Sequence, residues 1–176
     1  MTAAIWDILF HGIRGNKLKH GRRRGLIRGD VLCVEDEMLN KYGIWTGDRM
    51  IFYDRNQHGV KIVHEASLAD FLQGAEEYAI CEFPKKYGRP IEWLQTSAIS
   101  NVIMPQEKIW RMMERARKEW KYKLYSPEET ACRAESRIGT DGYETSEHFA
   151  VWCKTGIAES HELESIREFW DRIIVY

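Results

Sequence analysis

Cysteine has the widest range of chemistry in this chain, because a thiolate can act as a nucleophile, bind a metal or form a disulfide. The four cysteines are Cys33, Cys81, Cys132 and Cys153. No two of them form a CxxC pair, so their spacing does not indicate a structural zinc site and we expect no metal. Apolar segments surround them, which predicts buried free thiols and a reducing, cytoplasmic location.

Length and charge narrow the classes of function. The chain has 176 residues, enough for one domain, with 26 Lys or Arg against 27 Asp or Glu and a net charge of -1. A general nucleic-acid binder is normally strongly basic, so we expect no nucleic-acid partner. No apolar run approaches the roughly 20 residues that cross a bilayer. The first residues lack the basic start and the cleavage site of a signal peptide.

The basic residues are concentrated near the N-terminus. Residues 14–28 contain seven Lys or Arg and no acid, and they follow an apolar segment that includes Trp6 and Phe10. We treat residues 1–24 as a basic N-terminal arm. One interpretation is a solvated arm, and another is an arm that contacts an anionic membrane surface or an acidic partner. A third is that its apolar residues pack on the body.

Short strand patterns come first along the chain and helical patterns follow, which is typical of an α+β fold. Strands are predicted at 30–34, 42–46, 49–53, 60–64 and 78–83, and the turn Gly47-Asp48 joins two of them in a hairpin. Ser67 and Gly74 delimit a short helix. Longer helices are predicted after Pro105, over 126–138 and from about 145 to 156, with a last one in the tail. We therefore expect a small antiparallel sheet, within about 30–83, packed against C-terminal helices.

Two motifs resemble a known family. Residues 41–48, KYGIWTGD, resemble the H-Y-G-I-Y-x-G-D hairpin of the lecithin retinol acyltransferase family. Residues 146–156, SEHFAVWCKTG, resemble its N-C-E-H-F-x-x-W-C-x-x-G helix. The resemblance covers about Gly25 to Gly156. It implies a permuted papain-like fold related to the NlpC-type peptidases, in which a cysteine at a helix N-terminus faces two histidines on a sheet. Family members transfer acyl chains or cleave ester and amide bonds.

The chain departs from the family at the three positions of its catalytic triad. Lys41 and Tyr53 stand at the positions of the two histidines, and Ser146 stands at the position of the cysteine. A serine hydroxyl is a much weaker acid than a thiol and needs a positioned base, normally histidine. Tyrosine, with a pKa near 10, is not a base at neutral pH. These substitutions predict that thiol catalysis is absent.

An alternative keeps an activity at the same positions. Ser-Lys pairs catalyse acyl transfer when the lysine has a lowered pKa, so Ser146 and Lys41 could form such a dyad with Tyr53 as a third partner. His148 lies two residues after Ser146 and is expected to point away from it. His64 lies one hairpin away and could approach the cleft. The candidate binding residues are Tyr42, Trp45, His64 and His148.

These inferences lead to one main hypothesis. Residues 25–156 form a domain that resembles the lecithin retinol acyltransferase family, and residues 157–176 add a C-terminal helix packed on it. Without the thiol triad, we expect a pseudoenzyme that binds an acyl-like ligand or a protein partner and needs no cofactor. The alternative is an acyltransferase or hydrolase that uses the Ser146–Lys41 dyad. In either case we predict that Lys41, Tyr53 and Ser146 converge on one cleft, with Lys41 and Tyr53 as cross-strand neighbours.

Overall fold

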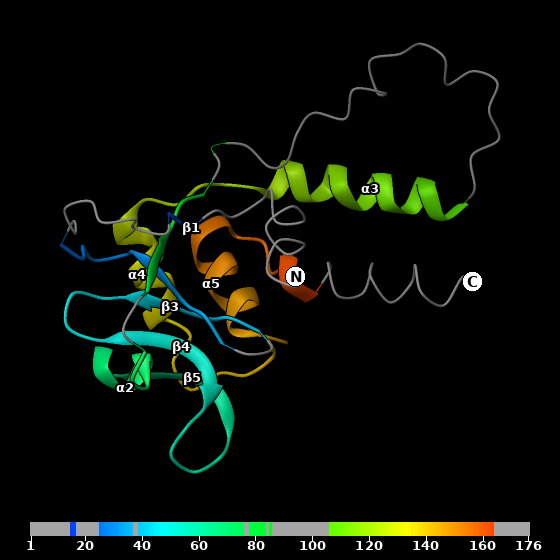
Figure 1. Cartoon of the computed structure of the whole chain (residues 1–176). Coiled ribbons are helices and arrows are strands. Elements are labelled where there is room, and N and C mark those ends of the chain that lie inside the picture. Colours follow the sequence, from blue (N-terminus) through cyan, green and yellow to red (C-terminus); the bar gives the residue numbers. More distant parts are fainter. Residues whose placement is uncertain are drawn as a thin grey trace, which may run out of the picture.

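A computed structural model describes residues 15–16, 25–36, 39–75, 78–83, 85 and 106–163. These residues form an α+β fold built on one antiparallel sheet (Figure 1). The predicted N-terminal arm, apart from its residues 15 and 16, lies outside them. So do residues 86–105 and the predicted C-terminal helix beyond Leu163.

The sheet has six strands in the order β1-β6-β2-β3-β4-β5, and every neighbouring pair is antiparallel. The strands are β1 (Gly15–Asn16), β2 (Val31–Val34), β3 (Lys41–Trp45), β4 (Met50–Arg55), β5 (Lys61–Ala66) and β6 (Ala79–Cys81). The five strands from β2 to β6 lie within the predicted range of 30–83. The two-residue β1 is an addition that sequence patterns did not indicate.

The predicted β3–β4 hairpin is confirmed. Ile44 pairs with Ile51 and Trp45 with Met50. The N–H of Thr46 donates to the carbonyl of Arg49 at 2.9 Å, which closes the turn around Gly47 and Asp48. Gly47 has a φ of +110°, which a residue with a side chain rarely adopts. The local turn residues therefore explain why the chain reverses here.

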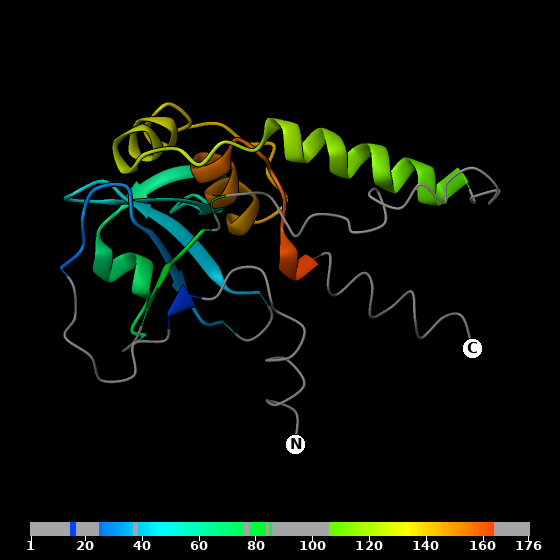
Figure 2. The same ribbon diagram turned by 90° about the horizontal axis from the view of Figure 1, so that it is seen from above.

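Helices cover both faces of the sheet (Figure 2). Helices α4 (Pro127–Glu135) and α5 (Ser146–Thr155) lie on one face, which we call the α5 face, and α2 (Leu68–Leu72) lies on the other, the α2 face. Each face has its own apolar core. The core of the α5 face includes Ile44, Ile51, Val63, Phe149 and Ala150. The core of the α2 face comprises Leu32, Val34, Met50, Phe52 and Phe71.

Local capping signals place the helices where the sequence predicts them. Ser126 accepts from the N–H of Glu129 while the Glu129 carboxylate accepts from the N–H of Ser126, and Pro127 opens α4. This capping box satisfies N–H groups that have no partner inside the helix. Helix α4 ends at Glu135 and continues as a turn to Gly139, so the predicted helix to residue 138 is three residues too long. Helix α3 (Gln106–Lys121) follows Pro105, as predicted.

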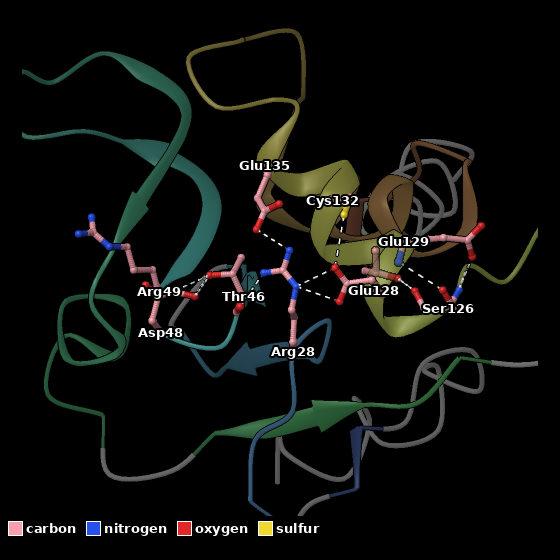
Figure 3. Close-up of polar contacts among 10 residues, drawn as sticks. Arg28, Thr46, Asp48, Arg49, Ser126, Glu128, Glu129, Cys132 and Glu135 are labelled. Carbon is pink, nitrogen blue, oxygen red and sulfur yellow. Dashed lines mark hydrogen bonds and ion pairs between the residues drawn. The ribbon is translucent and has the colours of Figure 1, made fainter.

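Arg28 fastens the hairpin turn to α4 (Figure 3). Its guanidinium pairs with Glu128 at 3.0 Å and Glu135 at 2.8 Å, and it donates to the carbonyl of Thr46 at 2.7 Å. Hydrogen bonds to the two carboxylates raise the pKa of Arg28 above its ordinary value. The last cation of the basic stretch 14–28 is thus bound to the body of the domain.

The cysteines are free, as predicted, but their burial differs from the prediction in one case. Cys81 and Cys153 are buried and Cys33 is half-buried. Cys132 is exposed, which corrects the prediction of a buried thiol. It lies on the outer side of α4, where its Sγ is 3.6 Å from a carboxylate oxygen of Glu128. Among the described helices, none combines the length and the apolar character that crossing a membrane requires.

Candidate functional site

Ser146 lies where α5 meets the start of β3. Thr145 is the N-cap of α5, because its hydroxyl accepts from the N–H of His148 at 3.1 Å. Ser146 is therefore the first residue of the helix, and its own side chain is directed to the sheet. Its Oγ accepts from the N–H of Tyr42 at 3.0 Å and donates to the carbonyl of Asn40 at 3.5 Å. At Tyr42 the backbone of β3 thus binds the helix.

The side chain of Tyr42 extends this contact to the C-terminal part of the domain. Its hydroxyl donates to Glu162 at 2.9 Å. The same carboxylate accepts from the backbone N–H and the side-chain amide of Asn40, at 3.0 and 2.6 Å. Burial raises the pKa of Glu162, and the nearby charge of Glu147 raises it further, while the donated hydrogen bonds oppose the shift. Nothing in the local sequence indicates this role for Glu162.

Glu147 holds the segment that carries Glu162. Its side chain is 2% exposed, and its carboxylate accepts from the hydroxyl of Ser160 and from the N–H groups of His161 and Glu162. These donors lie at the beginning of the helical turn 161–163, where N–H groups have no partner inside a helix. The first turn of α5, the start of β3 and residues 160–162 therefore form one hydrogen-bonded unit around Ser146.

Lys41 lies on the opposite face of the sheet from this unit. Its Nζ is 4.6 Å from the ring centre of Phe52 and 5.2 Å from that of Phe71, both in the core of the α2 face. The side chain is 11% exposed, and its Nζ makes no hydrogen bond to a described residue; a carboxylate oxygen of Asp54 lies 3.6 Å from it. Burial lowers the pKa of Lys41, and Asp54 partly opposes the shift.

Tyr53 lies on the α5 face. Its ring packs against Tyr143 at 5.5 Å between ring centres, and the ammonium of Lys61 lies 5.2 Å from its ring centre. Burial raises the pKa of Tyr53, and Asp141 adds to the shift, so the phenol stays protonated at neutral pH. These contacts of Tyr53 are with Tyr143 and with Lys61 of β5, and not with Ser146.

The three triad positions therefore do not converge, which corrects the predicted geometry. Lys41 is directed to the α2 face, while Tyr53 and Ser146 belong to the α5 side. Lys41 pairs with Asp54 rather than with Tyr53. The two-residue turn of the β3–β4 hairpin places Tyr42, not Lys41, opposite Tyr53. Side chains alternate along a strand, so Lys41 is on the other face from Tyr42 and Tyr53. Two parts of the prediction are confirmed: the N-terminus of α5 contacts the hairpin, and Ser146 is next to the N-cap residue.

The predicted binding residues are also divided between the faces. Tyr42 contributes to the α5 face, and His148 donates its backbone N–H to the N-cap of α5. Trp45 packs on the core of the α2 face. His64 lies 4.4 Å from Phe52 between ring centres, also on the α2 face, and its buried Nε2 makes no hydrogen bond to any described residue. The structure thus does not bring these four residues together.

The described residues contain no cluster of three or more His, Cys, Asp or Glu side chains that could hold a metal ion. No protein-family model matches the chain. No curated protein matches it either.

Proposed function

We propose that the chain is a domain of the lecithin retinol acyltransferase type that has lost catalysis and serves as a binding module for an acyl-like ligand or a protein partner. The proposal includes a permuted papain-like arrangement, and the docking of the N-terminus of α5 on the hairpin supports it. It also includes a cytoplasmic location, which the free thiols support.

The hydrogen bonds of the Ser146 hydroxyl are the main support for the loss of catalysis. A serine nucleophile needs a base within hydrogen-bond distance, about 2.6–3.2 Å, that takes its proton. The hydroxyl of Ser146 instead accepts from one backbone N–H and donates to a backbone carbonyl. Its role is therefore to join α5 to β3. A carbonyl oxygen is far too weak a base to generate the alkoxide.

The geometry does not favour the Ser146–Lys41 dyad. The lowered pKa of Lys41 is the property that such a base needs, but the ammonium lies among Phe52 and Phe71 on the α2 face. It makes no hydrogen bond to Ser146. Bringing the two groups together would require Lys41 to leave the core of that face.

A probe for activated serines tests the loss of catalysis. We expect a fluorophosphonate probe to label the full chain no faster than its Ser146→Ala variant, and both to be inert toward a p-nitrophenyl acyl ester. Ser126→Ala is the matched control, because Ser126 is also at the start of a helix and its hydroxyl accepts from a backbone N–H. Labelling that Ser146→Ala and Lys41→Met abolish, and Ser126→Ala preserves, would establish the dyad instead.

The class of ligand needs a separate measurement. Native mass spectrometry of the freshly purified chain will show a mass increase of one acyl chain if an acyl-like ligand is held. The bound molecule is then identified after denaturation. If no such mass is found and added fatty acids do not raise the melting temperature, the acyl-ligand part of the proposal fails and the protein partner is the alternative that is left to test.

A further inference from the structure

Helix α3 exposes a row of large apolar side chains. Trp110 is 66% exposed, Met113 is 63% exposed and Trp120 is 91% exposed. Their separations of three and seven residues place them along one side of a helix with 3.6 residues per turn. Large apolar side chains that are exposed together, with charged residues beside them, usually mark an interaction surface.

Met113 and Trp120 lie on the side of α3 opposite its contact with the described part of the domain, and Trp110 lies beside that side. Lys118 binds Glu159, a buried residue of the body, at 3.4 Å, so the side of α3 that carries Lys118 faces the domain. At about 100° per residue, Lys118 is roughly 140–160° around the helix from Met113 and Trp120. Figures 1 and 2 both show α3 projecting beyond the sheet and its covering helices. Within the described residues, the sheet and the helices α2, α4 and α5 therefore leave the row exposed.

Positive charge accompanies the apolar row. Arg117 is exposed four residues after Met113 and three before Trp120, so it neighbours both on the helix surface. Lys121 is exposed three turns after Trp110, on the same side. The helix as a whole contains six Lys or Arg against three Glu. The chain has a net charge of -1, so α3 is a local concentration of positive charge in a balanced protein.

We propose that α3 docks on an anionic lipid surface, lying in the plane of the membrane with Trp110, Met113 and Trp120 at the boundary between headgroups and acyl chains. Tryptophan suits this boundary because its ring is apolar and its indole N–H is polar. Arg117 and Lys121 would pair with anionic headgroups beside the inserted row. At 16 residues the helix is about 24 Å long, which suits lying on a bilayer rather than crossing it.

The complementary charge of anionic lipid favours this occupant over a protein groove. A groove that accepts an amphipathic helix encloses its apolar side chains, whereas here Arg117 lies between Met113 and Trp120. A planar surface with negative headgroups accommodates that arginine without burying it. Membrane docking by α3 does not depend on whether Ser146 is catalytic. It would therefore stand even if the proposal of a non-catalytic binding module failed.

Flotation of the full chain with vesicles tests the proposal. We expect it to bind vesicles of phosphatidylcholine mixed with phosphatidylserine, to bind phosphatidylcholine alone much less, and to be released by raised salt. Trp110→Ser with Trp120→Ser should weaken binding by about tenfold or more, and so should Arg117→Glu with Lys121→Glu. Val60→Ser and Arg55→Glu are matched controls at exposed positions of the β4–β5 hairpin, and neither should change binding.

Three results would overturn the proposal. The first is that the chain does not bind anionic vesicles. The second is binding that the α3 variants leave unchanged, which includes the case where deletion of residues 1–24 alone abolishes it. The third is concentration-dependent self-association that the tryptophan variants remove in the absence of vesicles, which would make a second copy of the chain the occupant. Because the substituted side chains are exposed, the variants should unfold at the same urea midpoint as the parent chain.

Discussion

The two faces of the sheet differ in whether their buried polar groups are hydrogen-bonded. On the α5 face, the Ser146 hydroxyl, the Tyr42 hydroxyl and the Glu147 carboxylate all have hydrogen-bond partners. On the α2 face, the Nζ of Lys41 and the Nε2 of His64 are buried and have no hydrogen-bond partner in the part of the chain that the structure describes. The first arrangement stabilises the fold, because each hydrogen bond of a buried polar group makes a net favourable contribution to the free energy of unfolding. The second costs stability, because a buried group without a hydrogen bond has lost its water.

This difference shows that adjacent residues of one short motif can have different structural roles. Lys41 and Tyr42 are adjacent in the hairpin motif, yet one side chain enters the core of the α2 face and the other enters the α5 face. Tyr42 joins the polar unit around Ser146, while Lys41 remains among phenylalanines. The same kind of substitution should therefore have opposite effects on the two faces.

The largest effect is expected at Glu147, on the α5 face. Glu147→Ala would leave three donors, the Ser160 hydroxyl and the N–H groups of His161 and Glu162, without their acceptor. Hydrogen bonds to a buried charged group contribute about 1.5–3 kcal/mol, so we expect a loss of about 3 kcal/mol in the free energy of unfolding. Urea unfolding measures it. Glu65→Ala, which removes an acid from an exposed pair with Arg49, should cost less than about 1 kcal/mol. Equal losses at the two positions would contradict the role of Glu147.

Adjacent substitutions at Lys41 and Tyr42 compare the faces directly. Lys41→Met keeps the apolar stem and removes a buried ammonium; its partner Asp54 is partly exposed and can be hydrated. We expect Lys41→Met to raise the free energy of unfolding by about 1 kcal/mol at neutral pH. Tyr42→Phe removes the hydroxyl that donates to Glu162 and should lower the free energy of unfolding by about 1 kcal/mol.

The pH dependence of the Lys41 effect provides a check. The folded pKa of Lys41 is lowered, so its charged form costs stability below that pKa, and the cost disappears as the pH rises toward the unfolded value of 10.5. The advantage of Lys41→Met should therefore shrink at alkaline pH. A Lys41→Met variant less stable than the parent chain would show that the ammonium stabilises the α2 face.

The sequence predicts those features of the fold that depend on neighbouring residues. The capping box of Ser126 and Glu129 and the turn at Gly47 and Asp48 are local, and both are confirmed. The sequence does not decide which residue caps α5, since Thr145 and Ser146 are both suitable N-cap residues. The structure uses Thr145 for the helix and leaves Ser146 to bind the sheet.

Most of the candidate site depends on contacts that the sequence does not display. The pairing of Lys41 is an exception, because the two-residue turn of the β3–β4 hairpin sets the register and therefore places Lys41 opposite Asp54. The prediction that Lys41 pairs with Tyr53 is one residue out of this register. The bond between Tyr42 and Glu162 joins residues 120 positions apart. No capping, turn or periodic signal indicates such a pair, because it arises only when the C-terminal segment packs against β3.

The smallest expected effect is a pair of opposite pH trends at two glutamates. Glu162 is buried and its pKa is raised above 4.5, so its contribution to stability is complete below pH 4.5 and is lost as the pH rises through the folded pKa. Glu129 is an exposed capping residue whose pKa is lowered, chiefly by the N–H of Ser126. Its contribution is present above pH 4.5 and is lost as the pH falls through the folded pKa.

Replacing each glutamate by glutamine removes its titration and keeps its size. Between about pH 7 and pH 4, the stability of the parent chain relative to Glu162→Gln should rise, and its stability relative to Glu129→Gln should fall. Urea midpoints at a series of pH values measure both trends. Burial raises the pKa of Glu162, and the charge of Glu147 raises it further. A fall at both positions would therefore mean that the Glu162 carboxylate is hydrated and that residues 160–162 do not cover the start of β3.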